Sequence, residues 1–179
     1  MDKEIMIRAE GPYDSPTISD LVRRAYVDVP YSDHREHLMI DRLRGTDAYC
    51  PALSLIAGIG DEAAGHILLT KAEICTERSS VSTLALAPLS VVPEHQFRGV
   101  GKRLVRAAHL RAADLGFESV LLVGIPIYYR QFGYEPLSRY PITLPFDAPD
   151  ENCMILRLAP HALDGVSGMV RYAEGWLDH

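Results

Sequence analysis

Residues 89–102 read Leu-Ser-Val-Val-Pro-Glu-His-Gln-Phe-Arg-Gly-Val-Gly-Lys, and this stretch decides the fold. It joins two runs of sequence: residues 80–92, rich in apolar and β-branched residues, predict a strand, and the amphipathic residues 99–115 predict a helix. The first N–H groups of such a helix have no intrahelical partner, and the helix dipole favours negative charge at this end. Gly99 and Gly101 would let an anion approach the backbone without a side chain in the way. The segment therefore predicts an anion-binding turn between a strand and a helix.

Two common nucleotide-binding motifs do not fit this turn. A P-loop would need glycine where Gln96 stands and a hydroxyl residue where Arg103 stands. A dinucleotide fingerprint that begins at Gly99 would need Gly or Ala where Leu104 stands, and a strand at the start of the domain. The pattern that remains is [Q/R]xxGxG directly after a strand. A purely structural role for the glycines is the alternative interpretation.

The elements around this turn predict an α/β arrangement. The continuous apolar run 120–123 is typical of a strand covered on both faces, so strand 80–92, helix 99–115 and this strand form a βαβ unit with a parallel strand pair. Runs 53–59 and 65–74 flank the turn residues Gly60-Asp61-Glu62 and predict an antiparallel hairpin. Two helices are expected to precede the sheet: one from Ser15, as N-cap, to about Asp28, and one from after Asp33 to Gly45. Short elements should follow near 127–132 (helix), 142–144 and 154–158 (strands).

The composition is that of an ordinary folded protein. The 179 residues, 47% hydrophobic and 23% charged, fit a single domain over residues 1–179. The charged N-terminus lacks the apolar core of a secretory signal, and no run approaches the roughly 20 apolar residues of a membrane span, which predicts a cytoplasmic protein without membrane contact. The net charge of -6 disfavours a nucleic-acid partner, because neutralising phosphates needs clustered Lys and Arg.

The cysteines and histidines do not predict a metal site. Cys50, Cys75 and Cys153 are isolated, odd in number and without CxxC spacing, so we expect reduced, buried thiols. His34 and His37 have the i, i+3 spacing of one helix face, but no third ligand of suitable type accompanies them.

Four stretches, in this order along the chain, carry a resemblance to a known family. They are Gly65-His66-Ile67, residues 86–94 (LAPLSVVPE), residues 96–101 (QFRGVG) and residues 128–134 (YYRQFGY). Together they resemble the GNAT superfamily of N-acetyltransferases, and within it the bacterial YhbS-like group of predicted acetyltransferases. The C-terminal residues 162–168 (ALDGVSG) are similar to that group as well.

The resemblance implies the GNAT fold, an α/β (α+β) architecture whose mixed central β-sheet is splayed at the parallel strand pair and flanked by helices. It also implies acetyl-CoA as cosubstrate. The pantetheine arm of acetyl-CoA would pair with residues 89–91 of strand 80–92, as an additional strand would. The pyrophosphate of acetyl-CoA would lie on the turn that contains Gly99 and Gly101. The Val91 N–H would stabilise the oxyanion of the tetrahedral intermediate. The residues implied in cofactor binding are Leu89, Ser90, Val91, Gln96, Phe97, Arg98, Gly99, Val100, Gly101 and Lys102.

The resemblance implies a catalytic tyrosine as well. Tyr129 stands four residues before Gly133, which matches the family tyrosine near the CoA sulfur and makes Tyr129 the candidate general acid. Tyr128 is the alternative in the neighbouring register, and simple packing of both tyrosines beside Phe132 and Tyr134 is the structural alternative.

No residue is assigned as general base. Glu73, Glu94 and His66 are the nearest candidates by sequence, and each has a structural interpretation: a solvent-facing strand residue, a loop charge and a hydrogen-bonded strand histidine. Relatives that carry Asp after the parallel strand differ from this chain, which has Gly124-Ile125-Pro126 there. The resemblance therefore implies no acidic contact at this point.

The expected activity is direct transfer of an acetyl group from acetyl-CoA to a primary amine. Transfer of another acyl group, a hydroxyl acceptor, and a non-catalytic acyl-CoA-binding module are the alternatives. A homodimer is the general expectation for the oligomeric state.

Overall fold

The computed structural model describes residues 3–177, within which nine strands form one mixed β-sheet. Neighbouring strands follow the order β1-β2-β3-β4-β5-β8-β6, while β9 pairs with β3 and β7. The strands are β1 (Ile5–Ala9), β2 (Ser54–Ile59), β3 (Glu62–Cys75), β4 (Ser80–Val91), β5 (Ser119–Val123), β6 (Glu135–Pro136), β7 (Ile142–Thr143), β8 (Cys153–Arg157) and β9 (Gly168–Arg171). Met1, Asp2, Asp178 and His179 lie outside the described residues.

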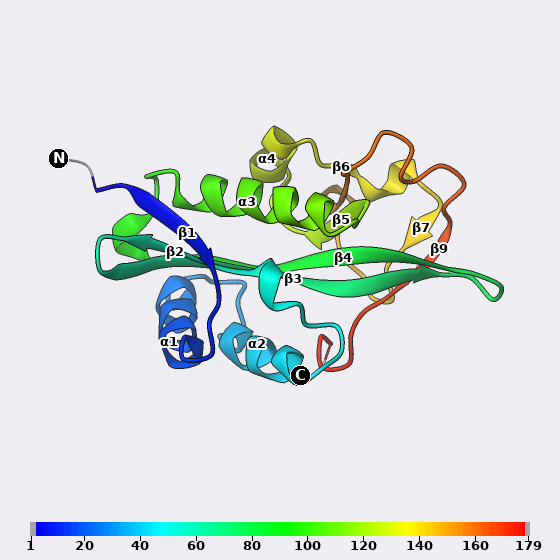
Figure 1. Cartoon of the computed structure of the whole chain (residues 1–179). Helices are drawn as coiled ribbons and strands as arrows, with labels where there is room; N and C mark the ends of the chain where they lie inside the picture. The colour runs from blue at the N-terminus through cyan, green and yellow to red at the C-terminus, as the bar shows by residue number, and fades with distance from the viewer. Residues whose placement is uncertain (1–2, 178–179) are drawn as a thin grey trace.

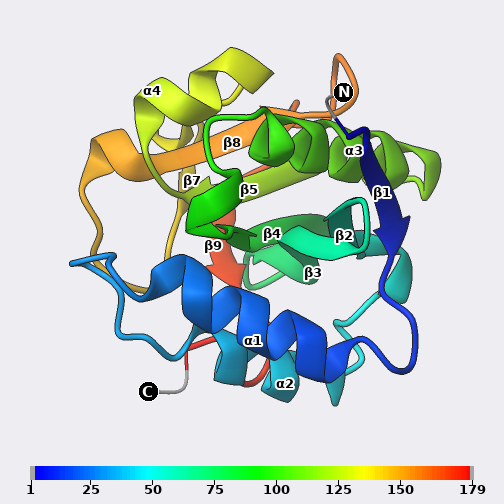
Figure 2. The same cartoon turned by 90° about the vertical axis from the view of Figure 1, so that its left-hand side faces the viewer.

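Helices cover both faces of the sheet. One face carries α3 (Val100–Asp114), and the other carries α1 (Ser15–Tyr26) and α2 (Glu36–Arg44), as Figures 1 and 2 show. The short α4 (Pro126–Tyr129) follows β5 on the α3 side (Figure 1). Single 3₁₀ turns are η1 (Pro51–Leu53), η2 (Pro93–His95), η3 (Arg130–Phe132), η4 (Leu137–Arg139) and η5 (Asp150–Asn152). The expected mixed sheet flanked by helices is confirmed.

The apolar stripes of the helices explain this layering. In α1 the buried residues Ile18, Leu21, Val22 and Ala25 recur at helical spacing and face the sheet. A corresponding stripe of α3 is buried against the opposite face. Burial of these two stripes on opposite faces fixes the three layers.

The parallel pair, β4 and β5, is splayed. The two strands pair only at Leu84 with Val120 and at Ala85 with Leu121. Beyond this point the register of β4 against β3 shifts, between the pairs Leu69–Leu86 and Ile67–Leu89. Leu89 to Val91 therefore keep β3 on one side and have no strand partner on the other.

Four features differ from the sequence-based expectations. The sheet begins before the helices, since β1 pairs with β2 from Ile5–Ile59 to Ala9–Leu55. The short strands β6 and β9 were also not predicted. Asp14, rather than Ser15, is the N-cap of α1, and its carboxylate accepts the Gly11 N–H and pairs with Arg8.

The expectation that His34 and His37 lie on one helix face is wrong. His34 precedes α2, which begins at Glu36, and has a positive φ of 61°, so it shares no helix face with His37. No group of three or more His, Cys, Asp or Glu side chains within residues 3–177 is placed to hold a metal ion. The three cysteines are free; Cys153 is buried, while Cys50 and Cys75 are only partly buried.

Close packing of α3 on the sheet depends on Gly65. A Cβ at this position would lie 2.9 Å from the Ser90 carbonyl oxygen, from Leu104 Cδ1 and from Val100 Cγ1. We expect Gly65→Ala to lower the free energy of unfolding by about 1–3 kcal/mol, because the helix must shift away from β3. Urea denaturation measures this loss.

The matched control for Gly65→Ala is Gly58→Ala in β2. There the nearest atom to a new Cβ, the Glu62 carbonyl oxygen, is 3.6 Å away, an ordinary contact. Equal urea midpoints for the two variants would show that α3 does not need a glycine at position 65.

Candidate functional site

The turn between β4 and α3 exposes backbone N–H groups. The chain leaves β4 at Val91, passes through η2, and enters α3 from Gly99, whose φ of 85° is left-handed. The Arg103 N–H closes the first helical turn on the Gly99 carbonyl at 3.1 Å. Helix geometry leaves the preceding N–H groups, those of residues 100–102, directed out of the helix end. Space above Gly99 is open, since a Cβ there would have no atom within 4 Å. The turn can therefore receive an anion.

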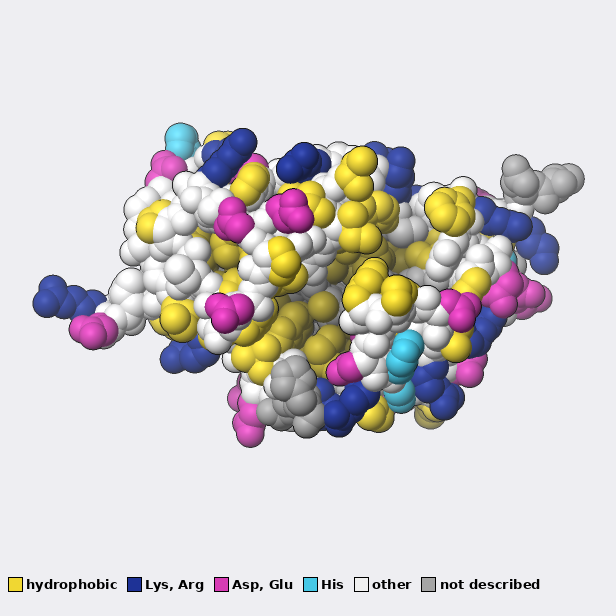
Figure 3. All heavy atoms as spheres, turned by 180° about the vertical axis from the view of Figure 1, so that it is seen from behind, with side chains coloured by type: hydrophobic (Ala, Val, Ile, Leu, Met, Phe, Trp, Pro, Cys, Tyr) yellow, Lys and Arg dark blue, Asp and Glu magenta, His cyan; other side chains and the backbone are white. Residues whose placement is uncertain are grey.

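A cleft of about 1140 Å³ opens beside this turn. On the face that Figure 3 shows, the molecule is hollowed near its centre, and hydrophobic side chains gather in the hollow. The cleft is lined from β4, the turn, the start of α3, the end of β5, α4 and the α1–α2 region. Its lining residues are Tyr26, Tyr31, Glu36, Met39, Leu86, Ala87, Pro88, Leu89, Val91, His95, Gln96, Phe97, Gly99, Val100, Gly101, Lys102, Val123, Gly124, Ile125, Tyr128, Tyr129, Pro149 and Asn152.

Two N–H groups of β4 point away from β3 toward this side. The Val92 N–H bonds the Ala64 carbonyl at 3.0 Å, so the hydrogen-bonded pairs of the antiparallel ladder are Val92–Ala64 and, two residues on, Ser90–His66. The N–H groups of Leu89 and Val91 alternate with these and face away from β3, where β5 has diverged. An extended ligand could pair with this free strand edge.

The cleft brings together most of the residues singled out from the sequence. Ser90 and Arg98 are the exceptions, since neither lines it. The Ser90 side chain is buried on the other face of β4. Phe97 has a positive φ of 60° and a fully exposed side chain. The Gln96 side chain donates from Nε2 to the Val91 carbonyl at 3.1 Å and so ties the turn to the end of β4.

The two tyrosines of α4 have different surroundings. The hydroxyl of Tyr128 lies against the start of α3, where a Cβ on Gly101 would be 2.6 Å from it. The ring of Tyr129 lies against Gly124, where a Cβ would be 2.6 Å from Cε2. A side chain at position 124 would therefore displace the Tyr129 ring.

Burial raises the pKa of Tyr129, and the nearby phenols of Tyr26, Tyr128 and Tyr31 raise it further. Burial also raises the pKa of Tyr128. Both phenols are therefore protonated at neutral pH. Tyr129, Tyr26 and Tyr31 line the same cleft. The ring contacts of Tyr129 with Phe132 and Tyr134 show that it packs as well as lines the cleft.

The α1–α2 wall of the cleft was not found by sequence reasoning. The Tyr26 phenol, at the end of α1, donates to the Leu89 carbonyl at 2.9 Å. Tyr31, Glu36 and Met39 complete this wall. The one available sequence signal was the position of Tyr26, four residues after the buried Val22 on the same helix.

The three candidate bases do not line the cleft. Glu94 is exposed and pairs with Arg24 at 2.8 Å. Glu73 is partly exposed on β3, where its carboxylate pairs with Arg171 and accepts the Ser80 hydroxyl at 2.8 Å. The interpretations of Glu73 as a strand-surface residue and of Glu94 as a loop charge are confirmed.

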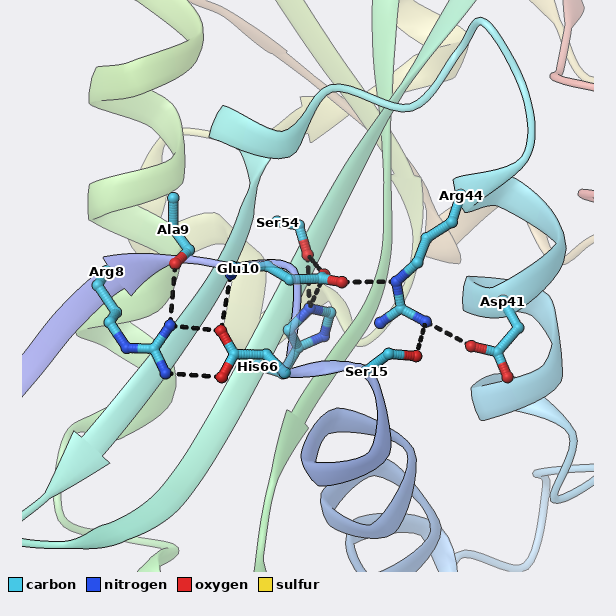
Figure 4. Close-up of polar contacts among 10 residues, drawn as sticks. Arg8, Ala9, Glu10, Ser15, Asp41, Arg44, Ser54 and His66 are labelled. Atoms are coloured by element: carbon cyan, nitrogen blue, oxygen red, sulfur yellow. Dashed lines mark hydrogen bonds and ion pairs between the residues drawn. The ribbon is translucent and has the colours of Figure 1, made fainter.

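His66 belongs to a buried polar network on the α1–α2 side of the sheet (Figure 4). Its Nε2 lies 2.9 Å from the Ser54 hydroxyl, so the expectation of a hydrogen-bonded strand histidine is confirmed. Glu10 accepts the Ser54 hydroxyl and pairs with Arg44 Nε at 2.6 Å. Burial first, and the Arg44 charge second, lower the pKa of His66 to about 3. His66 is therefore neutral and enclosed.

No helix in residues 3–177 is long and apolar enough to cross a bilayer.

Comparison with known proteins shows one family. Residues 7–137 match the family model described as acetyltransferase (GNAT) domain. The uncharacterized N-acetyltransferase YjhQ of Escherichia coli K12 is 36% identical over 129 residues, which cover 69% of this chain and 70% of that protein. The uncharacterized N-acetyltransferase YhbS of the same strain is 28% identical over 171 residues, 95% of this chain and 97% of that protein.

Solved structures show the same architecture. The crystal structure of Escherichia coli YhbS in complex with CoA superposes with a TM-score of 0.87 at 24% identity, over 98% of this chain and 93% of that chain. A GNAT family acetyltransferase from Brucella melitensis in complex with acetyl-CoA gives a TM-score of 0.79 at 26% identity, over 97% of this chain and 99% of that chain.

Proposed function

Because the chain belongs to the GNAT acetyltransferase family, we propose that this acyltransferase moves an acetyl group directly from acetyl-CoA to a primary amine. One observation carries the proposal: the free edge of β4 and the open N-terminus of α3 line the same cleft. An extended amide-bearing arm fits the first feature, and a pyrophosphate fits the second. The YhbS and Brucella melitensis structures, solved with CoA and acetyl-CoA, support this choice of cosubstrate.

The residues present fit acetyl-CoA. Leu89 and Val91 would pair with the pantetheine arm through their outward N–H groups. The backbone from Phe97 to Lys102 would hold the pyrophosphate, with Gly99 leaving open space and Lys102 adding positive charge. Gln96 would keep the turn against β4. The backbone of Ser90 would keep Leu89 and Val91 in the extended strand. The positive charge of Arg98, near the turn, would attract the pyrophosphate.

Acetyl-CoA would supply an activated acetyl thioester, and two groups of this chain would act on it. The Val91 N–H, free on the cleft side, would donate to the carbonyl oxygen as negative charge develops there. The Tyr129 phenol, protonated because its pKa is raised, would donate its proton toward the departing sulfur. Overall, one N–C bond forms and one C–S bond breaks, the amine loses a proton to solvent, and the sulfur gains one.

A cytoplasmic location for this reaction stays a prediction. A single-domain organisation over residues 1–179 and a homodimeric assembly likewise stay predictions.

The proposed function can be tested by thiol release. We expect the protein to release free CoA from acetyl-CoA when a primary amine is added, with formation of the N-acetylated amine detected by mass spectrometry. The same amines methylated to tertiary amines should give no release, because they cannot form a stable amide. Binding of acetyl-CoA without transfer to any amine in a broad panel would favour the non-catalytic acyl-CoA-binding alternative.

A further inference from the structure

The cleft has a charged residue toward each of its two ends. Within the described residues, its lining includes one acidic side chain, Glu36, and one Lys or Arg side chain, Lys102. Lys102 lies at the start of α3, where the proposed function puts the pyrophosphate. Glu36 lies in the first turn of α2, on the opposite wall. The acceptor side of the cleft is therefore acidic.

Glu36 lines the cleft without a cationic partner among the described residues. Glu10, Glu73 and Glu94 each pair with an arginine. Within residues 3–177 no Lys, Arg or His lies within ion-pair distance of Glu36. Its Oε1 accepts the Ser32 hydroxyl, which in turn accepts the His34 N–H at 2.9 Å. One neutral donor, the Ser32 hydroxyl, thus holds the carboxylate.

Two tyrosines, Tyr26 and Tyr31, line the cleft together with Glu36, and Tyr26 contacts β4. The Tyr26 phenol is hydrogen-bonded to the Leu89 carbonyl, two residues before the proposed oxyanion donor Val91. Tyr26 and Glu36 line the same cleft. Burial raises the pKa of the Tyr26 phenol, and the charge of Glu36 raises it further. Tyr31, largely exposed, lines the same wall.

We propose that the acceptor is a cationic primary amine on an apolar chain, and that Glu36, together with the rings of Tyr26 and Tyr31, binds its ammonium group. This inference rests on the proposed function and names its substrate class. A carboxylate without a cation and two aromatic rings attract an ammonium ion by ion pairing and by cation–π contact. Met39, Leu86 and Pro149, in the same cleft, suit an apolar chain. Acidic side chains lie at several points around the hollow in Figure 3 and would repel an anionic acceptor.

The test uses hexylamine and phenethylamine as acceptors, with 6-aminohexanoate as a matched acceptor that carries a negative charge. We expect both amines to accept the acetyl group and 6-aminohexanoate to be poor. Glu36→Gln should raise the KM of the amines about tenfold or more, because a charge-assisted contact is lost. Calorimetric titration of hexylamine into CoA-saturated protein should show the same loss of affinity without any turnover.

Two controls separate this inference from the function on which it rests. Glu77→Gln, at the exposed hairpin tip between β3 and β4, should leave the amine KM unchanged. The rise in melting temperature with acetyl-CoA should persist in Glu36→Gln, which shows that the variant is folded and binds the cosubstrate. Tyr31→Ala, on the exposed loop, offers a second variant and should also raise the amine KM.

The inference is overturned if Glu36→Gln and wild type share the same amine KM and affinity, or if 6-aminohexanoate is the better acceptor. It is also overturned if acetyl-CoA binds but neither amine binds or reacts. If the wild-type protein does not bind acetyl-CoA, the result contradicts the proposed function itself.

Discussion

Replacing Gly99 by Glu should abolish the rise in melting temperature that acetyl-CoA gives to the wild-type protein. A ligand that binds the native state at about 100 times its Kd stabilises a protein by about 2.7 kcal/mol, which thermal denaturation detects readily. Glu at position 99 would put a negative charge at the helix end proposed to hold the pyrophosphate. Its side chain would also occupy the open space above the turn.

Gly116→Glu is the matched control. Gly99 and Gly116 flank α3 at its two ends, have φ values of 85° and 88°, and would each place a Cβ with no atom within 4 Å. The two substitutions therefore impose similar backbone strain and the same charge. We expect Gly116→Glu to lower the melting temperature yet keep the full acetyl-CoA shift. Equal shifts in both variants would place the cofactor elsewhere.

Tyr129→Phe should lower kcat by about 10²- to 10⁴-fold while the acetyl-CoA melting shift stays that of wild type. The phenylalanine keeps the ring that lies against Gly124 and loses only the hydroxyl proposed to protonate the sulfur. Tyr13→Phe, at an exposed position outside the cleft, is the control. If Tyr128→Phe loses kcat and Tyr129→Phe does not, the acid is Tyr128.

The pH profile gives a second readout for Tyr129. A phenol that must be protonated loses its function as pH rises through its pKa, and burial raises the pKa of Tyr129 above the usual value of 10.0. We therefore expect kcat to rise with pH as the bound amine loses its proton and then to stay level to at least about pH 9. A fall in kcat on the alkaline side with an apparent pKa below 9 would contradict the assignment.

The central part of the fold was predictable because its signals are strong and local. Strand 80–92, helix 99–115 and strand 120–123 correspond to β4, α3 and β5, and the hairpin turn after Ile59 is confirmed. The strands that were missed are short and depend on tertiary pairing. In β1 only Ile5, Ile7 and Ala9 turn inward, while Met6 is exposed, so five residues carry too weak an alternation to identify a strand.

The turn proposed to hold the cofactor could be identified from the sequence, whereas the wall proposed to bind the acceptor could not. The turn from Gln96 to Lys102 is continuous in sequence, and its glycines have a direct backbone reason. The acceptor wall combines the end of α1, a loop and the first turn of α2, which approach β4 only after folding. Tyr26 illustrates the difficulty, because its hydrogen-bond partner, Leu89, is 63 residues away. The side chain of Ser90 is buried and does not line the cleft, which the sequence alone did not indicate.

The splay between β4 and β5 also bears on solubility. An unpaired strand edge invites pairing with other chains and is a common origin of aggregation. Here the unpaired stretch of β4 lies in the interior of the sheet order, with β5, β8 and β6 beyond it, rather than at its rim. Its outward carbonyls are already engaged, that of Leu89 by the Tyr26 phenol and that of Val91 by the Gln96 amide. The protein thus keeps two backbone donors ready for a ligand while offering a foreign strand few of the contacts needed to extend the sheet.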